Sequence, residues 1–477
     1  MVGGALVAVA WLQVAEATEP VTELTTEHGG VPVTLLLPAT PEPAPAVVVV
    51  HGFAGSRQLM RSTGIALAGA GYAVALPDLT GHGANPRPLR PDRDLDRLVA
   101  DVAAAMDALT DRPEVDPARV GLLGHSMGSG AAMAAGIASP DRVRAVVAVS
   151  PTDAEVSAEV PRDLLLVAGA REPRFVANAE DLLARAGGPG AQPGDGTARA
   201  LVVVPHVEHV GILFSPAMHR TAARWFDAAL GHGPSQVLAV PPIAWWFLHL
   251  VGALLVWRTA VALTHRTSPR AARLVPAHRA VLGVLGGGAL ATVLLLGLAP
   301  ALPLVEVAGM LVAPVLAAWF ALAGAAWLLA GATPGRPAGR DLAIGVAVLV
   351  GLVVAFGVLA HRTWLPWFPI APRVAPAAAF AVLVLPWTLA LAATLQGRRG
   401  VSGFLWWAGI TAGLLVGVGA AALVVPGLGF VALVLPLLPA VLGLTQVVWA
   451  PLERPWAAGL GTAAFLGWLL AVLFPLA

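Results

Sequence analysis

The pentapeptide Gly124-His125-Ser126-Met127-Gly128 has the residue types and spacing that can present a serine as a nucleophile. The mainly apolar residues 119–123 before it predict a short buried strand, and the small residues 129–135 after it predict a closely packed helix. A sharp strand-to-helix turn exposes the serine hydroxyl, and a side chain on either glycine would clash with the neighbouring elements. A plain Gly/Ser turn is the alternative in a chain with 52 glycines. Because strand, motif and helix follow in register, we predict that Ser126 is a nucleophile.

Two similar strand-to-loop junctions lie upstream. The apolar residues 45–51 end in the glycine-rich turn His51-Gly52-Phe53-Ala54-Gly55-Ser56, and residues 72–77 predict a strand followed by Asp78-Leu79-Thr80-Gly81-His82-Gly83. With the serine turn, these motifs resemble the α/β-hydrolase superfamily, including its serine esterases, lipases and dienelactone hydrolases. The resemblance covers about residues 20–232. It implies a mostly parallel sheet with helices on both faces, but it does not define a substrate. Residues 21–37 predict a hairpin that opens this sheet.

A serine needs a base that takes its proton and an acid that holds the base, in the superfamily order Ser, acid, His. Residues 163–168 predict a strand, and Glu172 lies three residues past Gly169, where the family places its acid, more often as Asp. Asp153, after the strand that ends at Ser150, is the alternative acid. In a third interpretation Glu172 is a solvated loop carboxylate beside arginines.

The candidate base lies in the loop that follows the last predicted strand, which covers residues 201–204. His209 lies where the family presents its histidine, and a helix starting near Ser215 then closes the domain. His206 is the alternative, although the loop needs a few residues to bend back over the sheet. We expect the remaining histidines of this half, His51, His82 and His125, to be structural.

The reaction of a serine nucleophile also needs preorganised hydrogen-bond donors for the developing oxyanion. One is the backbone N–H of Met127, directly after the serine. The resemblance implies that the second is the N–H of Phe53. Only a short segment separates Ser150 from Asp163, and the other expansion, 187–196, is rich in glycine and has no apolar face. We therefore predict a minimal domain with no helical cap and an open site, which favours accessible esters or short acyl groups.

From about residue 237 the chain consists of apolar runs of 19 to 26 residues, long enough to cross a hydrocarbon core of ~30 Å as helices. The sequence predicts an all-α membrane domain over 237–477 with eight spans, near 239–259, 280–300, 305–330, 342–360, 376–395, 402–424, 429–449 and 457–476. Thirteen of the 15 tryptophans follow residue 240, several near span ends, as in an interfacial aromatic belt.

Arginines set the expected orientation of this domain, since the chain has no lysine. Ten of the 12 arginines after residue 235 lie in or beside alternate connections, 260–279, 332–341, 396–400 and 450–456. The positive-inside rule places these connections in the cytoplasm and the hydrolase-like domain outside. The apolar residues 1–15 agree, because they resemble a signal peptide or signal anchor, with an ordinary strand as the alternative.

Charge and composition limit the function classes. Residues 1–235 carry a net charge of −8 and residues 236–477 a net charge of +9. The acidic first half has no basic stripe for nucleic acid, the chain has no cysteine, and no metal cluster or nucleotide-binding motif is visible. We therefore predict no cofactor and no metal.

The sequence favours a multi-pass serine hydrolase of the cell membrane, acting outside the cytoplasm on an ester or lipid-like acyl group by hydrolysis or acyl transfer. The alternative is a transport or lipid-handling protein whose hydrolase-like domain binds or modifies cargo. Intramembrane ionisable groups mark transport paths, and we find few of them: His249 in the first span and Glu306 near a span end. These favour anchoring over transport.

Overall fold

The computed structural model describes residues 1–18, 21–40, 42–90, 94–234, 237, 243–264 and 274–477. The chain divides into two compact units. The sheet unit comprises Ala8–Leu248 and Leu359–Trp367, and the helical unit comprises Met1–Val7, His249–Val358 and Phe368–Ala477.

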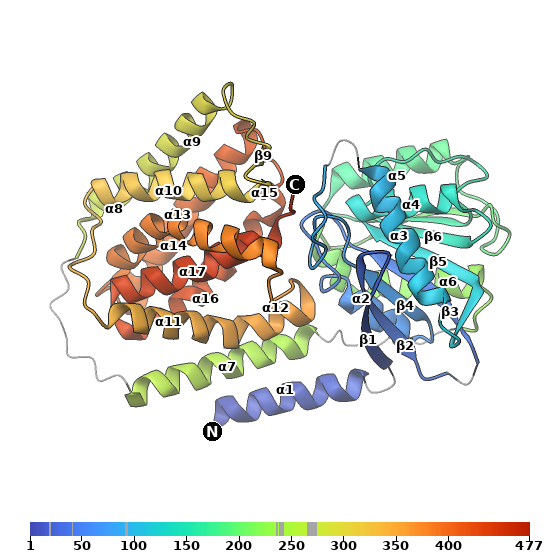
Figure 1. Cartoon of the computed structure of the whole chain (residues 1–477), viewed down its shortest axis with the longest axis horizontal. Coiled ribbons are helices and arrows are strands. Elements are labelled where there is room, and N and C mark those ends of the chain that lie inside the picture. The colour runs from blue at the N-terminus through green and yellow to red at the C-terminus, as the bar shows by residue number, and fades with distance from the viewer. Residues whose placement is uncertain (19–20, 41, 91–93, 235–236, 238–242, 265–273) are drawn as a thin grey trace. The chain divides into compact units, whose positions relative to one another are not determined.

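The sheet unit is built on eight strands in the order β1-β2-β4-β3-β5-β6-β7-β8 (Figure 1). Strands β1 and β2 form the predicted hairpin, β2 pairs antiparallel with β4, and the remaining pairs are parallel. The expected mostly parallel α/β-hydrolase fold is thereby confirmed. The strands are β1 (Val21–His28), β2 (Val31–Pro38), β3 (Ala44–Val50), β4 (Ala73–Pro77), β5 (Val115–His125), β6 (Val143–Val149), β7 (Leu164–Gly169) and β8 (Arg199–Val204).

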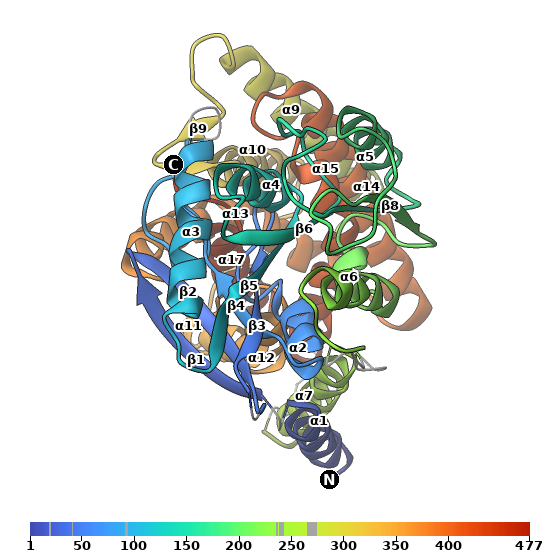
Figure 2. The same ribbon diagram turned by 90° about the vertical axis from the view of Figure 1, so that its right-hand side faces the viewer.

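Helices cover both faces of this sheet, which is why its central strands are continuous apolar runs. Strand β3 is buried along its whole length. Helices α2 (Arg61–Gly69) and α6 (Pro216–Ala229) lie on one face, and α3 (Leu95–Thr110) and α4 (Met127–Ala138) lie on the other (Figure 2). Helix α5 (Pro173–Arg185) packs against β7 and β8. On the α6 face, Phe226 packs directly over Gly121 of β5, where a β-carbon would lie 2.6 Å from its ring.

The segment between β6 and β7 adds nothing over the sheet. Residues 151–163 are all described and contain neither helix nor strand. The parallel strands therefore end in short loops at one edge, with no helical cap inserted at this point.

Among the residues that the structure describes, seven helical segments are long and apolar enough to cross a membrane. They are α7 (Ile243–Thr264); α8 (Ala277–Val281) continuing through a π-helical turn into α9 (Gly287–Leu298); α11 (Asp341–Leu352) continuing likewise into α12 (Val358–Thr363); α13 (Ala371–Leu395); α14 (Gly400–Val424); α15 (Val431–Val434) with α16 (Leu438–Trp449); and α17 (Pro455–Leu473). A shorter apolar helix, α10 (Ala313–Leu329), has 17 residues.

One predicted span is wrong over its first part. The run 305–330 was expected to be one helix, but Glu306–Val307 and Met310–Leu311 form a two-stranded hairpin, β9 and β10, before α10 begins. The turn between them has positive φ at Ala308 and Gly309, which breaks any helix. Apolar composition alone does not distinguish such a hairpin from a helix.

The arginine-rich connections meet at one end of the helical unit. Arg454 forms an ion pair with Asp341 at 2.5 Å, which joins the connections 450–456 and 332–341. Arg398 donates to the carbonyl of Val275 at 2.7 Å, which joins 396–400 to the segment before α8. The predicted contributions of Arg266, Arg270 and Arg273 lie outside the described residues.

The other connections meet at the opposite end. The buried guanidinium of Arg373, at the start of α13, donates to the carbonyls of Ala471 (2.5 Å) and Phe474 (2.8 Å). Met310 of the hairpin forms a β-bridge with Leu476. Alternate connections therefore share an end, as consecutive membrane spans require. Which end faces the cytoplasm stays a prediction.

The N-terminal apolar run is a helix, α1 (Val2–Thr18), so the alternative that it is a strand is wrong. Its role as a signal peptide or anchor stays a prediction.

Candidate active site

The loops that follow β5, β7 and β8 bring Ser126, Glu172 and His209 together. Because the carboxyl ends of parallel strands lie at one edge of a sheet, residues distant in the chain meet there. His209 Nε2 lies 3.1 Å from Ser126 Oγ, and its Nδ1 lies 2.8 Å from Glu172 Oε2. The side chains of Glu172 and His209 are buried. This chain of contacts joins a hydroxyl, an imidazole and a carboxylate.

The backbone around Ser126 is a strained turn. Its φ of 54° and ψ of −125° are rare for a residue with a side chain, and α4 begins at the next residue. A β-carbon on Gly124 would lie 2.1 Å from the carbonyl oxygen of Gly128, and one on Gly128 would lie 2.4 Å from that of His51. The steric reason for two glycines is therefore confirmed.

Glu172 is held by more than the histidine. Its Oε1 accepts hydrogen bonds from the Ser150 hydroxyl at 2.7 Å and from the backbone N–H of Gly169 at 2.5 Å. Sequence analysis did not assign Ser150 a role. The available signal was a polar residue directly after the apolar strand β6, since such a residue lies at the same sheet edge as the serine turn.

The alternative residues lie elsewhere. The Asp153 side chain is 75% exposed and pairs with Arg185, and His206 is exposed with a positive φ. The structure brings neither of them to Ser126. Glu172 is not a solvated loop carboxylate, since it is only 6% exposed.

Two aromatic rings fix the orientation of His209. Phe175 of α5 stacks on it with ring centroids 4.3 Å apart and an angle of 19°. His125 lies beside it, and its Nε2–H donates to the His209 carbonyl at 2.9 Å. Burial lowers the pKa of His125 well below its ordinary value, with repulsion from His209 as a smaller cause. A neutral His125 therefore supports the loop, in line with the structural role expected for it.

His51 organises the turn that carries Phe53. Its Nε2 accepts from the N–H of Leu79 at 3.0 Å, so its protonated Nδ1 donates to the carbonyl of Gly52 at 2.8 Å. Burial lowers the pKa of His51, which keeps this neutral tautomer. Gly52 passes directly beside the serine, because a β-carbon on it would lie 2.9 Å from Ser126 Cβ.

The backbone N–H of Met127 is the other expected donor. Met127 is the first residue of α4, and the first N–H groups of a helix have no acceptor within the helix. Both segments that were expected to supply oxyanion donors therefore border Ser126.

The sheet unit also includes residues Leu359–Trp367, which follow α11 in the chain. The buried Ser56 hydroxyl donates to the carbonyl of Trp364 at 2.9 Å, and the Trp364 side chain packs against the apolar core. Ser56 ends the turn that begins at His51. This remote segment therefore supports the turn that carries Phe53.

Comparisons with known proteins agree with this fold. Residues 45–204 match the family described as the alpha/beta hydrolase fold. An uncharacterized protein of Mycobacterium tuberculosis is 41% identical over 107 residues, covering 22% of this chain and 36% of that protein. Epoxide hydrolase A of the same organism is 36% identical over 108 residues (22% and 32%), and a putative esterase of Nocardia uniformis subsp. tsuyamanensis is 35% identical over 147 residues (28% and 42%). The chain thus spans about a third to two fifths of the length of these curated relatives.

Among solved structures, the dienelactone hydrolase of Anabaena variabilis aligns with 43% of this chain and 97% of its own, at 24% identity and a TM-score of 0.33. The observed sheet and the family match over residues 45–204 show an α/β-hydrolase fold, followed by a helical region with several membrane-capable helices. Within the described residues, no group of three or more His, Asp and Glu could hold a metal ion.

Proposed function

We propose that this protein is a membrane-bound serine hydrolase that cleaves carboxylic esters through a triad of Ser126, His209 and Glu172. The observation that carries the proposal is the pair of contacts on His209, 3.1 Å to the Ser126 hydroxyl and 2.8 Å to the Glu172 carboxylate. A nucleophile, a base and an orienting acid in this order are what acyl transfer requires.

In the first half-reaction, Ser126 Oγ attacks the ester carbonyl carbon while His209 Nε2 takes the hydroxyl proton. Glu172 holds the other ring N–H and stabilises the imidazolium that forms. The N–H groups of Met127 and Phe53 donate to the oxyanion, and loss of one such donor typically costs about 2.7–4 kcal/mol in the transition state. The tetrahedral intermediate then expels the alcohol, which receives its proton from His209.

In the second half-reaction, water gives a proton to His209 and attacks the acyl carbon attached to Ser126. The collapse of this intermediate releases the carboxylic acid and restores the serine hydroxyl. If an alcohol replaces water, the same steps transfer the acyl group instead.

The substrate class follows from the surroundings of the site. Residues 151–163 carry no helix that could close over Ser126, which favours accessible esters with short acyl groups or lipid-like esters presented at a bilayer. The similarity to a putative esterase supports ester chemistry. The alternation of arginine-rich connections supports a reaction outside the cytoplasm.

The proposal is tested by assaying the purified full-length protein on p-nitrophenyl esters of increasing acyl length. We expect turnover that is highest for short chains and that falls at least a thousandfold in Ser126→Ala, because the remaining groups supply only part of the catalysis. Ser129→Ala is not a suitable control, since that hydroxyl donates to the Ser126 carbonyl at 2.6 Å. Ser139→Ala is the better matched variant, as Ser139 lies at the far end of α4. Equal turnover by Ser126→Ala and wild type would reject the proposal.

A further inference from the structure

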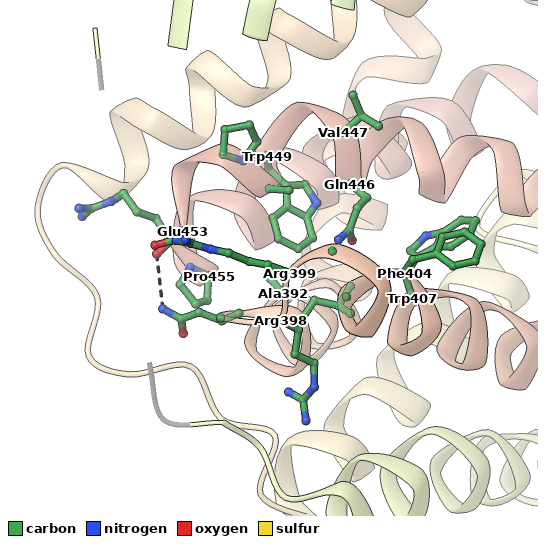
Figure 3. A pocket seen from close by; sticks show the side chains of 18 of the residues that line it. Ala392, Arg398, Arg399, Phe404, Trp407, Gln446, Val447, Trp449, Glu453 and Pro455 are labelled. Atoms are coloured by element: carbon green, nitrogen blue, oxygen red, sulfur yellow. Dashed lines mark hydrogen bonds and ion pairs between the residues drawn. The ribbon is translucent and has the colours of Figure 1, made fainter. Parts of the chain in front are cut away.

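A cavity of about 650 Å³ opens at the end of the helical unit where the arginine-rich connections meet (Figure 3). It is lined from the C-terminal turn of α13, the connection 396–399, the first turns of α14, α16 and the start of α17, with Arg258 of α7 completing it. All of these residues belong to the helical unit. The cavity is therefore separate from the triad of the sheet unit.

The charge of this cavity is positive. Arg258, Arg398, Arg399 and Arg454 line it together with a single carboxylate, Glu453. Glu453 pairs with Arg399, and Arg454 is paired with Asp341. No carboxylate in the described part of the chain forms an ion pair with Arg258 or Arg398.

Arg398 is held in place although no carboxylate balances it. Its guanidinium donates to the carbonyls of Thr394 and Val275 and lies 4.2 Å from the ring centre of Trp406. Burial lowers its pKa, which means that the surroundings disfavour its positive charge. An anion in the cavity would compensate this charge.

Two helix N-termini border the same cavity. Arg399 and Arg454 are the N-cap residues of α14 and α17, and neither helix has a side-chain cap. The first N–H groups of a long helix carry a partial positive charge and suit an anion. This adds to the field of the arginines.

The remaining lining is apolar and aromatic, and it holds two unpaired polar atoms. Phe404, Trp407 and Val447 line it (Figure 3). Trp407 Nε1 and Gln446 Oε1 are buried and have no hydrogen-bond partner among the described residues. A donor and an acceptor beside an apolar wall suit a ligand that is polar at one end and apolar at the other.

We propose that this cavity binds a phosphate group, with Arg258 and Arg398 as its principal ligands. Arginine donors match phosphate oxygens, and basic pockets between membrane helices hold anionic headgroups. The source of the phosphate is either an anionic phospholipid of the surrounding leaflet or a free phosphate from solution. The site does not depend on the proposed hydrolysis.

The test uses the full-length protein in nanodiscs of phosphatidylcholine with a minor share of phosphatidylglycerol. Native mass spectrometry after release counts the phosphatidylglycerol retained by each protein molecule. We expect retention by the wild type and about tenfold weaker binding in Arg258→Gln and in Arg398→Gln, since each change removes a charge-assisted hydrogen bond. Arg336→Gln removes an exposed arginine outside the cavity and should bind as the wild type does.

A second variant is expected to strengthen binding. Glu453→Gln removes the only carboxylate among the lining residues and releases Arg399 from its ion pair. We expect phosphatidylglycerol to bind several-fold more tightly to this variant. A gain of binding cannot arise from misfolding, so it separates the proposal from damage caused by the Arg398 substitution.

A titration of the detergent-solubilised protein with inorganic phosphate, followed by its thermal shift, separates the two sources. A free anion is identified as the ligand if phosphate stabilises the wild type but not Arg258→Gln, and if phosphatidylglycerol is not preferentially retained. Retention of the lipid without a phosphate effect identifies the headgroup. Equal binding of both probes by wild type, Arg258→Gln and Glu453→Gln, or binding of neither, overturns the proposal.

Discussion

At the scale of single residues, Glu172 is the best-connected member of the site. Its carboxylate is in contact with the His209 ring nitrogen, the Ser150 hydroxyl and the Gly169 N–H. A buried carboxylate is tolerated only when such donors replace water, so its position is fixed by three separate parts of the chain. Both ring nitrogens of His209 therefore have a partner, Glu172 at Nδ1 and Ser126 at Nε2.

A series of substitutions tests the acid. In the proposed triad, His209→Ala should lower turnover about as far as Ser126→Ala, because the members act as a unit. Glu172→Gln should cost less, about 10²–10⁴-fold, since it leaves the serine and the base in place. Asp153→Asn should stay within about twofold of wild type, because solvent screens an exposed ion pair. Ester turnover measures all three, and a larger loss in Asp153→Asn than in Glu172→Gln would refute the assignment of the acid.

The contact among Ser126, Glu172 and His209 could be predicted from sequence motifs, because each residue follows a recognisable strand at one sheet edge. Ser150 and Phe175 could not be assigned in the same way. The position of Ser150 directly after β6 indicates only that it lies at this edge. Its contact with Glu172, and that of Phe175 with His209, form only when β6, β7 and α5 pack together.

At the scale of elements, the serine turn is a junction where α4 and β3 lie in close backbone contact. Gly128 of α4 lies against the end of β3, so even a methyl group at this position would overlap the backbone of residues 50 and 51. Backbone atoms have no alternative rotamer, so the overlap can be relieved only by moving the helix or the strand.

Gly128→Ala should therefore prevent α4 from docking on β3 and greatly reduce the yield of folded protein. Gly190→Ala is the matched control, since a β-carbon there meets nothing within 4 Å. Thermal unfolding of the purified variants provides the measurement. A Gly128→Ala protein with the melting temperature of wild type would show that the packing of this turn differs from the structure.

Helix α6 contains a buried histidine that makes its docking sensitive to pH. Burial lowers the pKa of His219 to about 4, and its Nε2 lies 2.8 Å from the Leu213 carbonyl. The pKa of this histidine is about 4 in the folded state and 6.5 in its ordinary, unfolded environment. Between these two values the folded state therefore binds fewer protons than the unfolded state. This contribution to stability is complete above pH ~6.5 and is lost as the pH falls from there towards about 4.

The loss is about 3 kcal/mol over this window, from 1.36 kcal/mol per pKa unit. His219→Gln keeps an N–H for the Leu213 carbonyl but cannot titrate, so its melting temperature should fall less than that of wild type between pH 7 and pH 4.5. Differential scanning fluorimetry measures both profiles. Parallel profiles would show that His219 does not contribute to the pH dependence.

Most elements of both units follow from apolar runs and their flanking turns. The hairpin before α10 does not, because its residues are as apolar as a membrane helix and only the backbone at Ala308 and Gly309 separates the two conformations. This also bears on the transport alternative. Transport would need ionisable residues within the membrane helices, and Glu306 was one of the two candidates named from the sequence. It is exposed on β9 and does not lie within a helix.

At the scale of the whole molecule, charge differs between the two halves of the chain and also between the two ends of the helical unit. The first half is acidic and the second basic, and within the helical unit the arginine-rich connections share one end, as the contacts of Arg454 and Arg398 show. The grouping of connections could be predicted from the sequence because membrane insertion depends on the charges of short loops. The same rule predicts that this end is cytoplasmic.

Cysteine labelling tests this topology, since the native chain contains no cysteine. Asp195→Cys in the hydrolase domain should react with an impermeant maleimide on intact cells. Gly335→Cys, in an arginine-rich connection, should react only after the cells are lysed. The reverse pattern would place the hydrolase domain in the cytoplasm.

The proposed role of Ser126 as the nucleophile is tested by mapping the adduct of a fluorophosphonate probe. Membranes containing the wild-type protein are labelled, digested and analysed by peptide mass spectrometry, with Ser126→Ala as the parallel sample. If Ser126 is the nucleophile, we expect one probe-modified residue, Ser126, and no labelling of the variant. A modified residue other than Ser126, or equal labelling of Ser126→Ala, would contradict it.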